Sequence, residues 1–592
     1  METTQKPPIF ASAARILSGA RLGESGWWKG FIADANLRAV LLIWTLCCLS
    51  LGVLLKKFGT ALPWCDEWDL TPVASGARAL TLDWIFEAAN EHRAPLTRLT
   101  VLCLGRLFSW DLRFVHFINL ALIALGALAL IGAVRAVRGR SALSDAFLCL
   151  LILTPWQYQS LLVYCYSYAM ALSVLCFAIS AALTCWPLRS LSHLGVYFGL
   201  LMAITLSAGP AGNLWAVGLC GVVVRGWLEP KPRSWKIGGL AGTAIVTAIS
   251  VLMFWSIPHV NHHDAFRADT LASFLAATAQ LSVGWLGHPV AVLWPWVFLV
   301  FLYLLVVLLA KMTMQHWKTW IDLTIPLVAM LAVAAMIGYG RGNYAPLWQS
   351  LYCTLLLPIG VMCYLLLVRL RAPGVILNCL VLTMMFSAGW NWPVVIGLGR
   401  VWHEPIAAAE GALKDGSMPL TVWASCHGDA VGSSQHKNRL MEYLVQLRSA
   451  RLSVFRKGVK QPRPGRGWPI TLEAENGRLT GNIQVICDLL ATRDHALGPI
   501  SLTGDAGSAA YEVEVPASGS YQLCCRIDPQ ARSHVINLQV DEGPVLATPI
   551  AASKEYSPYI LGPFEMAAGK HIFHLTMPKP GLRLDFLELI RL

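Results

Sequence analysis

The fold is decided by residues 39–69, AVLLIWTLCCLSLGVLLKKFGTALPWCDEWD. The run over residues 39–55 is apolar throughout, and a helix needs about 20 such residues to cross a membrane. Directly after it come two tryptophans and three carboxylates in a segment that we call the acidic segment, residues 64–69. Acidic side chains are costly beside lipid, so their place next to a span indicates a special role. The carboxylates are those of Asp66, Glu67 and Asp69.

The composition indicates a membrane protein. Of the 592 residues, 56% are hydrophobic and only 14% are charged, whereas a soluble domain carries about 25% charged residues. The net charge of +12 does not indicate a nucleic-acid partner, because the basic residues fall largely in short loops between apolar stretches, where they set topology. The 24 tryptophans suit the interfacial belts of a membrane protein and surfaces on which sugars stack.

Hydropathy predicts about eleven membrane-spanning helices. Residues 1–37 form the expected cytoplasmic N-terminal segment, and residues 38–395 form the expected transmembrane domain. The expected spans are 39–55, 113–134, 145–162, 164–184, 190–208, 211–228, 237–257, 290–310, 321–338, 346–369 and 374–395.

The basic loops predict the orientation of these spans. With the N-terminus inside, an eleven-span chain places five basic stretches in the cytoplasm, as the positive-inside rule requires. These are 135–140, Arg189, 225–236, 311–318 and 369–371. The outer parts are then 58–112, 258–289, 339–345 and everything after 395. Lys56 and Lys57 are the exception, and we expect them to snorkel at the outer interface. No cleavable signal is expected, because no small-residue cleavage site follows the first span.

The chain changes character after residue 395. Residues 396–468 mix helix-like stretches, such as 436–450, with a basic linker at 456–468. From residue 469 the hydrophobic period becomes two, as in 511–515 and 571–575, which predicts an all-β sandwich of the jelly-roll type over 469–592. Four cysteines lie in the expected oxidising compartment, so one disulfide can form, but spacing does not choose its partners. They are Cys426, Cys487, Cys524 and Cys525.

An acidic pair in the first outer loop, directly after the first span, resembles the membrane glycosyltransferases of the GT-C superfamily. The resemblance rests on Asp66, Glu67 and Asp69 together with the Asn-Glu-His-Arg stretch at 90–93, and it extends over 38–395 by topology. It implies a polyprenyl-phosphate-linked sugar as donor and a carboxylate of this loop, here Asp66, as general base. Glu67 and Asp69 would orient the acceptor, or bind a divalent metal ion if one takes part.

Five other residues are candidates for substrate binding. Transfer from a lipid phosphate needs cations beside the leaving group, for which arginine is suited. The candidates are Glu91, His92, Arg93, Arg341 and Asn343. Glu91 to Arg93 could equally form an ion-paired helix end, and Arg341 could be a snorkelling interfacial arginine. No metal site is predicted, since no His/Cys cluster has the spacing of ligands.

The C-terminal domain resembles carbohydrate-binding modules of the jelly-roll kind. The resemblance rests on residues 472–476, 510–513, 516–521 and 584–589, and it implies a glycan ligand. A β-sandwich that only caps the membrane part is the alternative.

The sequence thus predicts a multi-pass enzyme of a bacterial inner membrane. It would transfer a sugar to a periplasmic glycan, lipid or protein, with the C-terminal domain in the periplasm. Two other classes stay open. A transporter or flippase of lipid-linked sugars would use broken helices near mid-membrane, and in a non-enzymatic glycan-binding scaffold the acidic segment would be dispensable.

Overall fold

The computed structural model divides the chain into two compact units, which are described separately. The first, called the membrane unit, comprises Met1–Gly59, Leu80–Gly105 and Leu112–Val401, and the second comprises Thr60–Ala79, Arg106–Asp111 and Trp402–Leu592. Within these bounds the structure describes residues 34–88, 93–163, 167–185, 188, 190–256, 261–314, 320–343, 350–415, 437–456, 470–473, 478–481, 483–487, 495–499, 507–515, 517–528, 532–552, 557–577 and 582–591.

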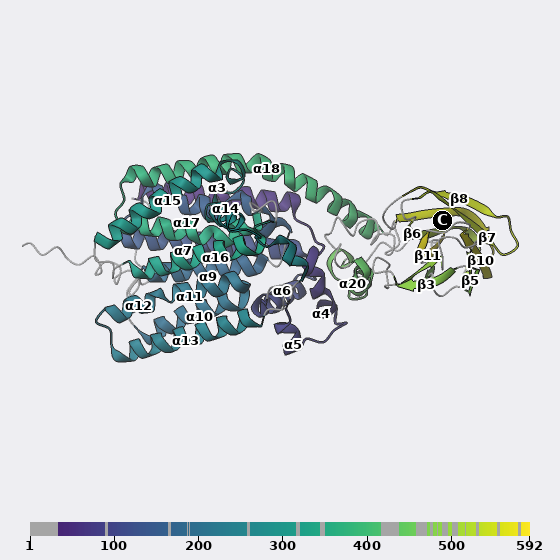
Figure 1. Ribbon diagram of the computed structural model, residues 1–592, viewed down its shortest axis with the longest axis horizontal. Coiled ribbons are helices and arrows are strands. Elements are labelled where there is room, and N and C mark those ends of the chain that lie inside the picture. Colours follow the sequence, from purple (N-terminus) through teal and green to yellow (C-terminus); the bar gives the residue numbers. More distant parts are fainter. Residues whose placement is uncertain are drawn as a thin grey trace, which may run out of the picture. The chain divides into compact units, whose positions relative to one another are not determined.

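The membrane unit is a bundle of apolar helices. Eight helical segments of the described chain are long and apolar enough to cross a membrane, and four shorter apolar helices accompany them. The expectation of about eleven spans therefore stays a prediction. The helices are α3 (Ala35–Phe58), α5 (Leu82–Phe86), α6 (Pro95–Leu107), α7 (Leu112–Arg138), α8 (Ala146–Ile152), α9 (Ser167–Thr184), α10 (Leu191–Ser207), α11 (Gly209–Leu219), α12 (Gly221–Leu228), α13 (Arg233–Trp255), α14 (Leu271–Ser282), α15 (Val290–Met314), α16 (Ile321–Arg341), α17 (Ser350–Arg369) and α18 (Gly374–Asp415) (Figure 1).

Burial separates the centre of this bundle from its rim. In α17, 78% of the apolar window is buried, whereas in α15 the share is 11%. Helix α17 contacts α7, α8, α9, α14 and α16, so it lies at the centre. The exposed leucines, valines and aromatic residues of α15 suit a lipid-facing helix, because lipid tails solvate apolar side chains.

Ion pairs join several helix ends at one face of the membrane unit. Asp322, at the start of α16, accepts hydrogen bonds from Arg225 of α12 and Arg369 of α17, each at 2.7 Å. At the start of α8, Asp145 accepts from Arg138 at the end of α7, at 2.6 Å. The ends of α7, α12 and α17 therefore share a face with the starts of α8 and α16. The basic stretches at 135–140, 225–236 and 369–371, which the sequence places on one side, meet here.

Two helices are interrupted inside the membrane unit. The expected span 145–162 is α8 followed by the short helices η3 (Pro155–Gln157) and η4 (Gln159–Val163), because Pro155 lacks the N–H that a continuing helix needs. Residues 258–289, expected as a loop, contain α14 and η6 (Gly284–Leu286). Gly287, at φ +86°, separates them from α15 in a conformation that favours glycine.

A small group of helices in the second unit, called the acidic module, comprises the described residues of 60–79, 106–111 and 402–456. Its elements are η1 (Cys65–Leu70), α4 (Thr71–Ser75), the last part of α18, α20 (Lys437–Ser449) and η8 (Ser453–Phe455). Helix α20 packs on α4. Helix α4 ends at Ser75, because Gly76 adopts a φ of +84° that stops the helix. The helix expected at 436–450 is confirmed as α20.

The C-terminal domain consists of two antiparallel sheets. One has the order β3-β4-β11-β6-β9 with β1 also paired to β11, and the other has the order β2-β5-β10-β7-β8. The strands are β1 (Ile470–Glu473), β2 (Arg478–Gly481), β3 (Ile483–Cys487), β4 (His495–Pro499), β5 (Gly507–Val515), β6 (Gly519–Asp528), β7 (His534–Val540), β8 (Leu546–Ile550), β9 (Ser557–Met566), β10 (Gly569–Met577) and β11 (Arg583–Arg591).

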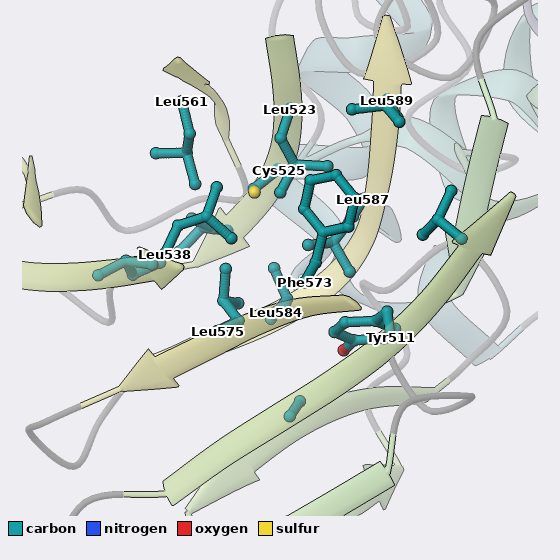
Figure 2. Close-up of a cluster of buried hydrophobic side chains, with 14 of the residues drawn as sticks. Tyr511, Leu523, Cys525, Leu538, Leu561, Phe573, Leu575, Leu584, Leu587 and Leu589 are labelled. Carbon is teal, nitrogen blue, oxygen red and sulfur yellow. The ribbon is translucent and has the colours of Figure 1, made fainter. Parts of the chain in front are cut away.

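The two sheets share one hydrophobic core. Figure 2 shows Tyr511, Phe573 and Leu575 of one sheet facing Leu523 and Leu587 of the other, and all belong to a single buried cluster. Along β5, buried residues alternate with more accessible ones, as a half-buried strand requires. Each fully buried leucine or phenylalanine contributes about 1.5–3 kcal/mol. The expected sandwich of two β-sheets is present.

Candidate functional site

The acidic segment forms a short 3₁₀ helix, η1, whose first turn is held by a hydrogen bond. Cys65 has a φ of +50°, a left-handed conformation that is rare for a residue with a side chain. The Glu67 carboxylate is 1% exposed and accepts a hydrogen bond from the Trp64 backbone N–H at 2.9 Å. Glu67 therefore caps the first turn of η1, so its position supports a structural role.

Aromatic rings of distant segments enclose the acidic segment. Trp64 lies edge-on to Trp402, with ring centroids 5.3 Å apart. Trp68 is fully buried and lies parallel to Tyr443 of α20, with centroids 6.4 Å apart and planes within 5°. These partners come from the chain after the last expected span, so residues 60–79 and the described residues of 402–456 pack together in the second unit.

Asp69 differs from Glu67 in its accessibility. Asp69 is half-buried, and its Oδ1 accepts a hydrogen bond from the Tyr443 hydroxyl at 3.5 Å. Asp66 lies in η1 directly before Glu67, but its side chain is outside the described residues. Among its described side chains, the acidic segment thus combines a buried carboxylate, that of Glu67, with one that solvent or a ligand can reach, that of Asp69.

Two side chains from distant segments form hydrogen bonds with the backbone just before the acidic segment. Glu410 of α18 is 7% exposed, and its Oε1 accepts from the N–H of Ala61 at 2.5 Å and of Leu62 at 3.3 Å. The Ser453 hydroxyl donates to the Ala61 carbonyl at 2.8 Å. Sequence reasoning missed Glu410, Tyr443 and Ser453. None belongs to a motif, and only the tertiary fold brings them to residues 61–69.

The expected phosphate-binding residues of the membrane unit contact protein groups. Arg93 donates to the Ser256 carbonyl from Nε at 3.0 Å and Nη2 at 2.8 Å, and to the Phe86 carbonyl from Nη1 at 2.5 Å. It therefore ties the segment before α6 to the end of α13. Glu91 and His92, the other candidates of this stretch, lie outside the described residues.

Arg341 and Asn343 lie at the end of α16. The Arg341 guanidinium lies over the Phe266 ring, 5.5 Å from its centroid, and Asn343 donates from Nδ2 to the Arg267 carbonyl at 2.7 Å. Beside them, Gly340 faces open space, whereas a Cβ at Gly342 would lie 2.6 Å from that of Ala268. A side chain would therefore fit at position 340 but clash at position 342.

A polar cluster stabilises the break before α15. Asn391 of α18 is fully buried, accepts from the His288 N–H at 2.9 Å and donates to the Leu286 carbonyl at 3.2 Å. Trp390 donates to His288 Nδ1 at 3.1 Å, so the imidazole carries its proton on Nε2. The cluster holds the irregular backbone around Gly287, which needs polar partners inside an apolar bundle.

One side-chain pair in the β domain joins two titratable groups, His571 and Asp541. His571 contacts Asp541 Oδ2 from Nδ1 at 2.7 Å and the Ala567 carbonyl from Nε2 at 2.9 Å. Both nitrogens face acceptors, and the hydrogen bond to Asp541 raises the pKa of His571 above its usual value. Slight burial acts to raise the pKa of Asp541, but hydrogen bonds from the Ile572 N–H and His571 outweigh it and lower that pKa.

Metal and disulfide chemistry find little support in the described part of the chain. No three metal-binding side chains gather among the described residues. Cys525 is fully buried in the β core, and burial raises the pKa of its thiol. The side chains of Cys426 and Cys487 lie outside the described residues.

Comparison with known proteins yields matches to solved structures alone. No protein-family model and no curated protein matches the chain. A family 35 carbohydrate-binding module from Clostridium thermocellum matches at 16% identity and a TM-score of 0.19, over 21% of this chain and 98% of the module. A module of Cellvibrio mixtus lichenase 5A, solved with cellotriose, matches at 20% identity and a TM-score of 0.19, over 21% and 97% of the two chains.

Larger proteins match over a similar part of this chain. The Podospora anserina β-(1,4)-mannanase matches at 18% identity and a TM-score of 0.19 over 20% of this chain, which spans only 27% of the mannanase. The C-terminal β domain thus resembles carbohydrate-binding modules of families 35 and 6. At these identities and TM-scores the likeness carries no ligand or activity over to this chain.

Proposed function

We propose that the protein is a membrane glycosyltransferase of the GT-C kind that takes a sugar from a polyprenyl-phosphate donor. The observation that carries the proposal is the acidic segment directly after the first apolar helix. Its 3₁₀ turn is fixed by Glu67 and leaves the Asp69 carboxylate accessible. A fixed carboxylate can take a proton from an acceptor hydroxyl, which is the task of a general base.

The proposed reaction needs three groups. The carboxylate of Asp66 takes the proton of the acceptor hydroxyl, whose oxygen attacks the anomeric carbon. The bond from that carbon to the phosphate oxygen breaks, and polyprenyl phosphate leaves with the electron pair, so the anomeric configuration inverts. Asp69 orients the acceptor. A cation must compensate the charge of the leaving phosphate, and Arg341 is the candidate that the sequence offers. Glu67 keeps the turn in place.

Two substitutions test these roles separately. Asp66→Asn keeps the size of the side chain but cannot take a proton at neutral pH, so we expect turnover to fall about 10²- to 10⁴-fold with donor affinity retained. Arg341→Ala should instead weaken donor binding. The assay measures release of polyprenyl phosphate from polyprenyl-phosphate hexoses and pentoses in nanodiscs. Near-normal transfer by Asp66→Asn would refute the proposal.

The β domain is proposed to hold the acceptor glycan. Deleting residues 470–592 should leave the membrane unit folded and donor binding intact, while use of a polymeric acceptor weakens. If the truncated chain transferred sugar to that acceptor at the full rate, this role would be wrong.

A transporter of lipid-linked sugars is the second candidate. The observation that favours it is the pair of interrupted helices at Pro155 and Gly287, because transporters place their sites at broken helices. A transporter would move the lipid-linked sugar between leaflets without releasing polyprenyl phosphate. The release assay therefore separates the two candidates.

A further inference from the structure

The end of α18 and the chain after it hold the backbone that leads into the acidic segment through two side chains, those of Glu410 and Ser453. Both polar backbone atoms of Ala61 are engaged, the N–H by Glu410 and the carbonyl by Ser453. These partners lie 349 and 392 positions further along the chain. Glu410 also takes the next N–H, that of Leu62, so a single carboxylate fixes two successive peptide groups.

The charge of Glu410 strengthens this grip. Glu410 is 7% exposed, so its carboxylate has lost most of its hydration. The two backbone N–H groups and Lys414 Nζ, at 3.2 Å, replace the lost water as hydrogen-bond donors. Hydrogen bonds to an ionised acceptor are roughly twice as strong as neutral ones. Residues 61–62 therefore have little freedom to move relative to α18.

Tyr443 acts on the acidic segment itself. Its ring lies parallel to that of Trp68, and its hydroxyl reaches Asp69 Oδ1. One side chain of α20 thus contacts both an aromatic residue and a carboxylate of η1. Replacing the hydroxyl would leave the ring contact in place, so the two contributions can be tested independently.

We propose that Glu410 and Tyr443 are positioning residues for the carboxylates of the acidic segment. The reaction centre is then assembled from the first outer loop and from the chain after residue 395, which is more than a spacer to the β domain. This inference rests on the proposed function. A general base works only within about 2.6–3.2 Å of the proton that it takes, and a misplacement of about 1 Å can cost about 10²-fold in rate.

Two conservative substitutions test the inference. Tyr443→Phe keeps the ring and removes the hydroxyl, and Glu410→Gln keeps the shape and removes the charge. For both we expect kcat for polyprenyl-phosphate hexose or pentose to fall about ten-fold or more, with KM for the donor unchanged. Glu410→Gln should also speed hydrogen exchange of the Ala61 and Leu62 amides about ten-fold.

Matched controls are Tyr303→Phe and Glu229→Gln. Tyr303 is 68% exposed on α15, and Glu229 pairs with Arg225 outside the acidic module, so neither should change kcat or exchange at residues 61–62. A loss of kcat with faster exchange spread evenly over α18 and α20 would indicate general unfolding and overturn the positioning role.

The outcomes separate this inference from the proposed function. An active wild-type chain whose kcat is unchanged in both variants would overturn the positioning role and leave the transferase standing. A wild-type chain that releases no polyprenyl phosphate from any of these donors would refute the transferase activity. It would also refute the catalytic role of the contacts that Glu410 and Tyr443 make.

Discussion

Among the charged residues described in the membrane unit, Asp322 is expected to contribute most to the stability of the fold. Its carboxylate is fully buried and bridges Arg225 and Arg369 at 2.7 Å each. The side chains of these arginines are only 23% and 13% exposed. Asp322→Asn would leave two largely buried guanidinium groups close together without their shared anion. The substitution keeps the size of the side chain, so packing stays nearly unchanged.

The magnitude follows from the two contacts. Each hydrogen bond to a charged group contributes about 1.5–3 kcal/mol, and breaking a buried ion pair by removing one partner costs about 3–5 kcal/mol. We therefore expect the free energy of unfolding to fall by about 3–5 kcal/mol, roughly a hundred- to several-thousand-fold in the equilibrium constant. Titration of the micelle-bound protein with denaturing detergent measures this change.

The control is a substitution in an exposed pair. Asp264 contacts Arg267 at 3.0 Å with side chains 47% and 39% exposed, so Asp264→Asn should change the free energy of unfolding by about 0–1 kcal/mol. If Asp322→Asn changed it no more than this control, the bridge would not stabilise the bundle and the reasoning from burial would be refuted.

Three further predictions concern other parts of the chain. Glu67→Ala should lower stability by about 0.5–2 kcal/mol through loss of the helix cap, and unfolding titrations of the full chain would measure it. In the β domain, the pair of His571 and Asp541 should stabilise most between about pH 4 and 6.5. The contribution of His571 is lost as pH rises through its raised pKa, and that of Asp541 as pH falls through its lowered pKa. Protection of the β10 amides from hydrogen exchange, relative to the unfolded chain at the same pH, should therefore be highest in that window. A reporter fused after Leu592 should be active outside the cytoplasm, and activity restricted to the cytoplasm would reverse the predicted topology.

Much of the fold could be predicted because it depends on local periodicity. The strands expected at 511–515 and 571–575 lie in β5 and β10, since alternation of apolar residues directly reports a half-buried strand. Apolar runs likewise indicated the helices of the membrane unit. Their interruptions were missed at Pro155 and Gly287, because a hydropathy window averages over a single proline or glycine.

The candidate site was less predictable because its support is tertiary. The composition of residues 64–69 drew attention to the acidic segment, but nothing local distinguishes the buried Glu67 from the accessible Asp69. That difference comes from the turn of η1, which directs Glu67 to the Trp64 N–H, and from Tyr443. Residues more than 300 positions apart formed this arrangement, and one sequence without its fold does not pair them.

The ionic bridge at Asp322 also bears on the choice between transferase and transporter. Alternating access moves one part of a bundle against another, and Asp322 ties α16 at once to α12 and to the central helix α17. A movement that separated these helices would break this bridge, and a charge left buried without its partner costs about 3–5 kcal/mol. A transferase needs no such movement, since its donor and acceptor meet at one face. The bridge therefore argues against a transport cycle that separates α12, α16 and α17, and it leaves open a cycle in which these helices move together.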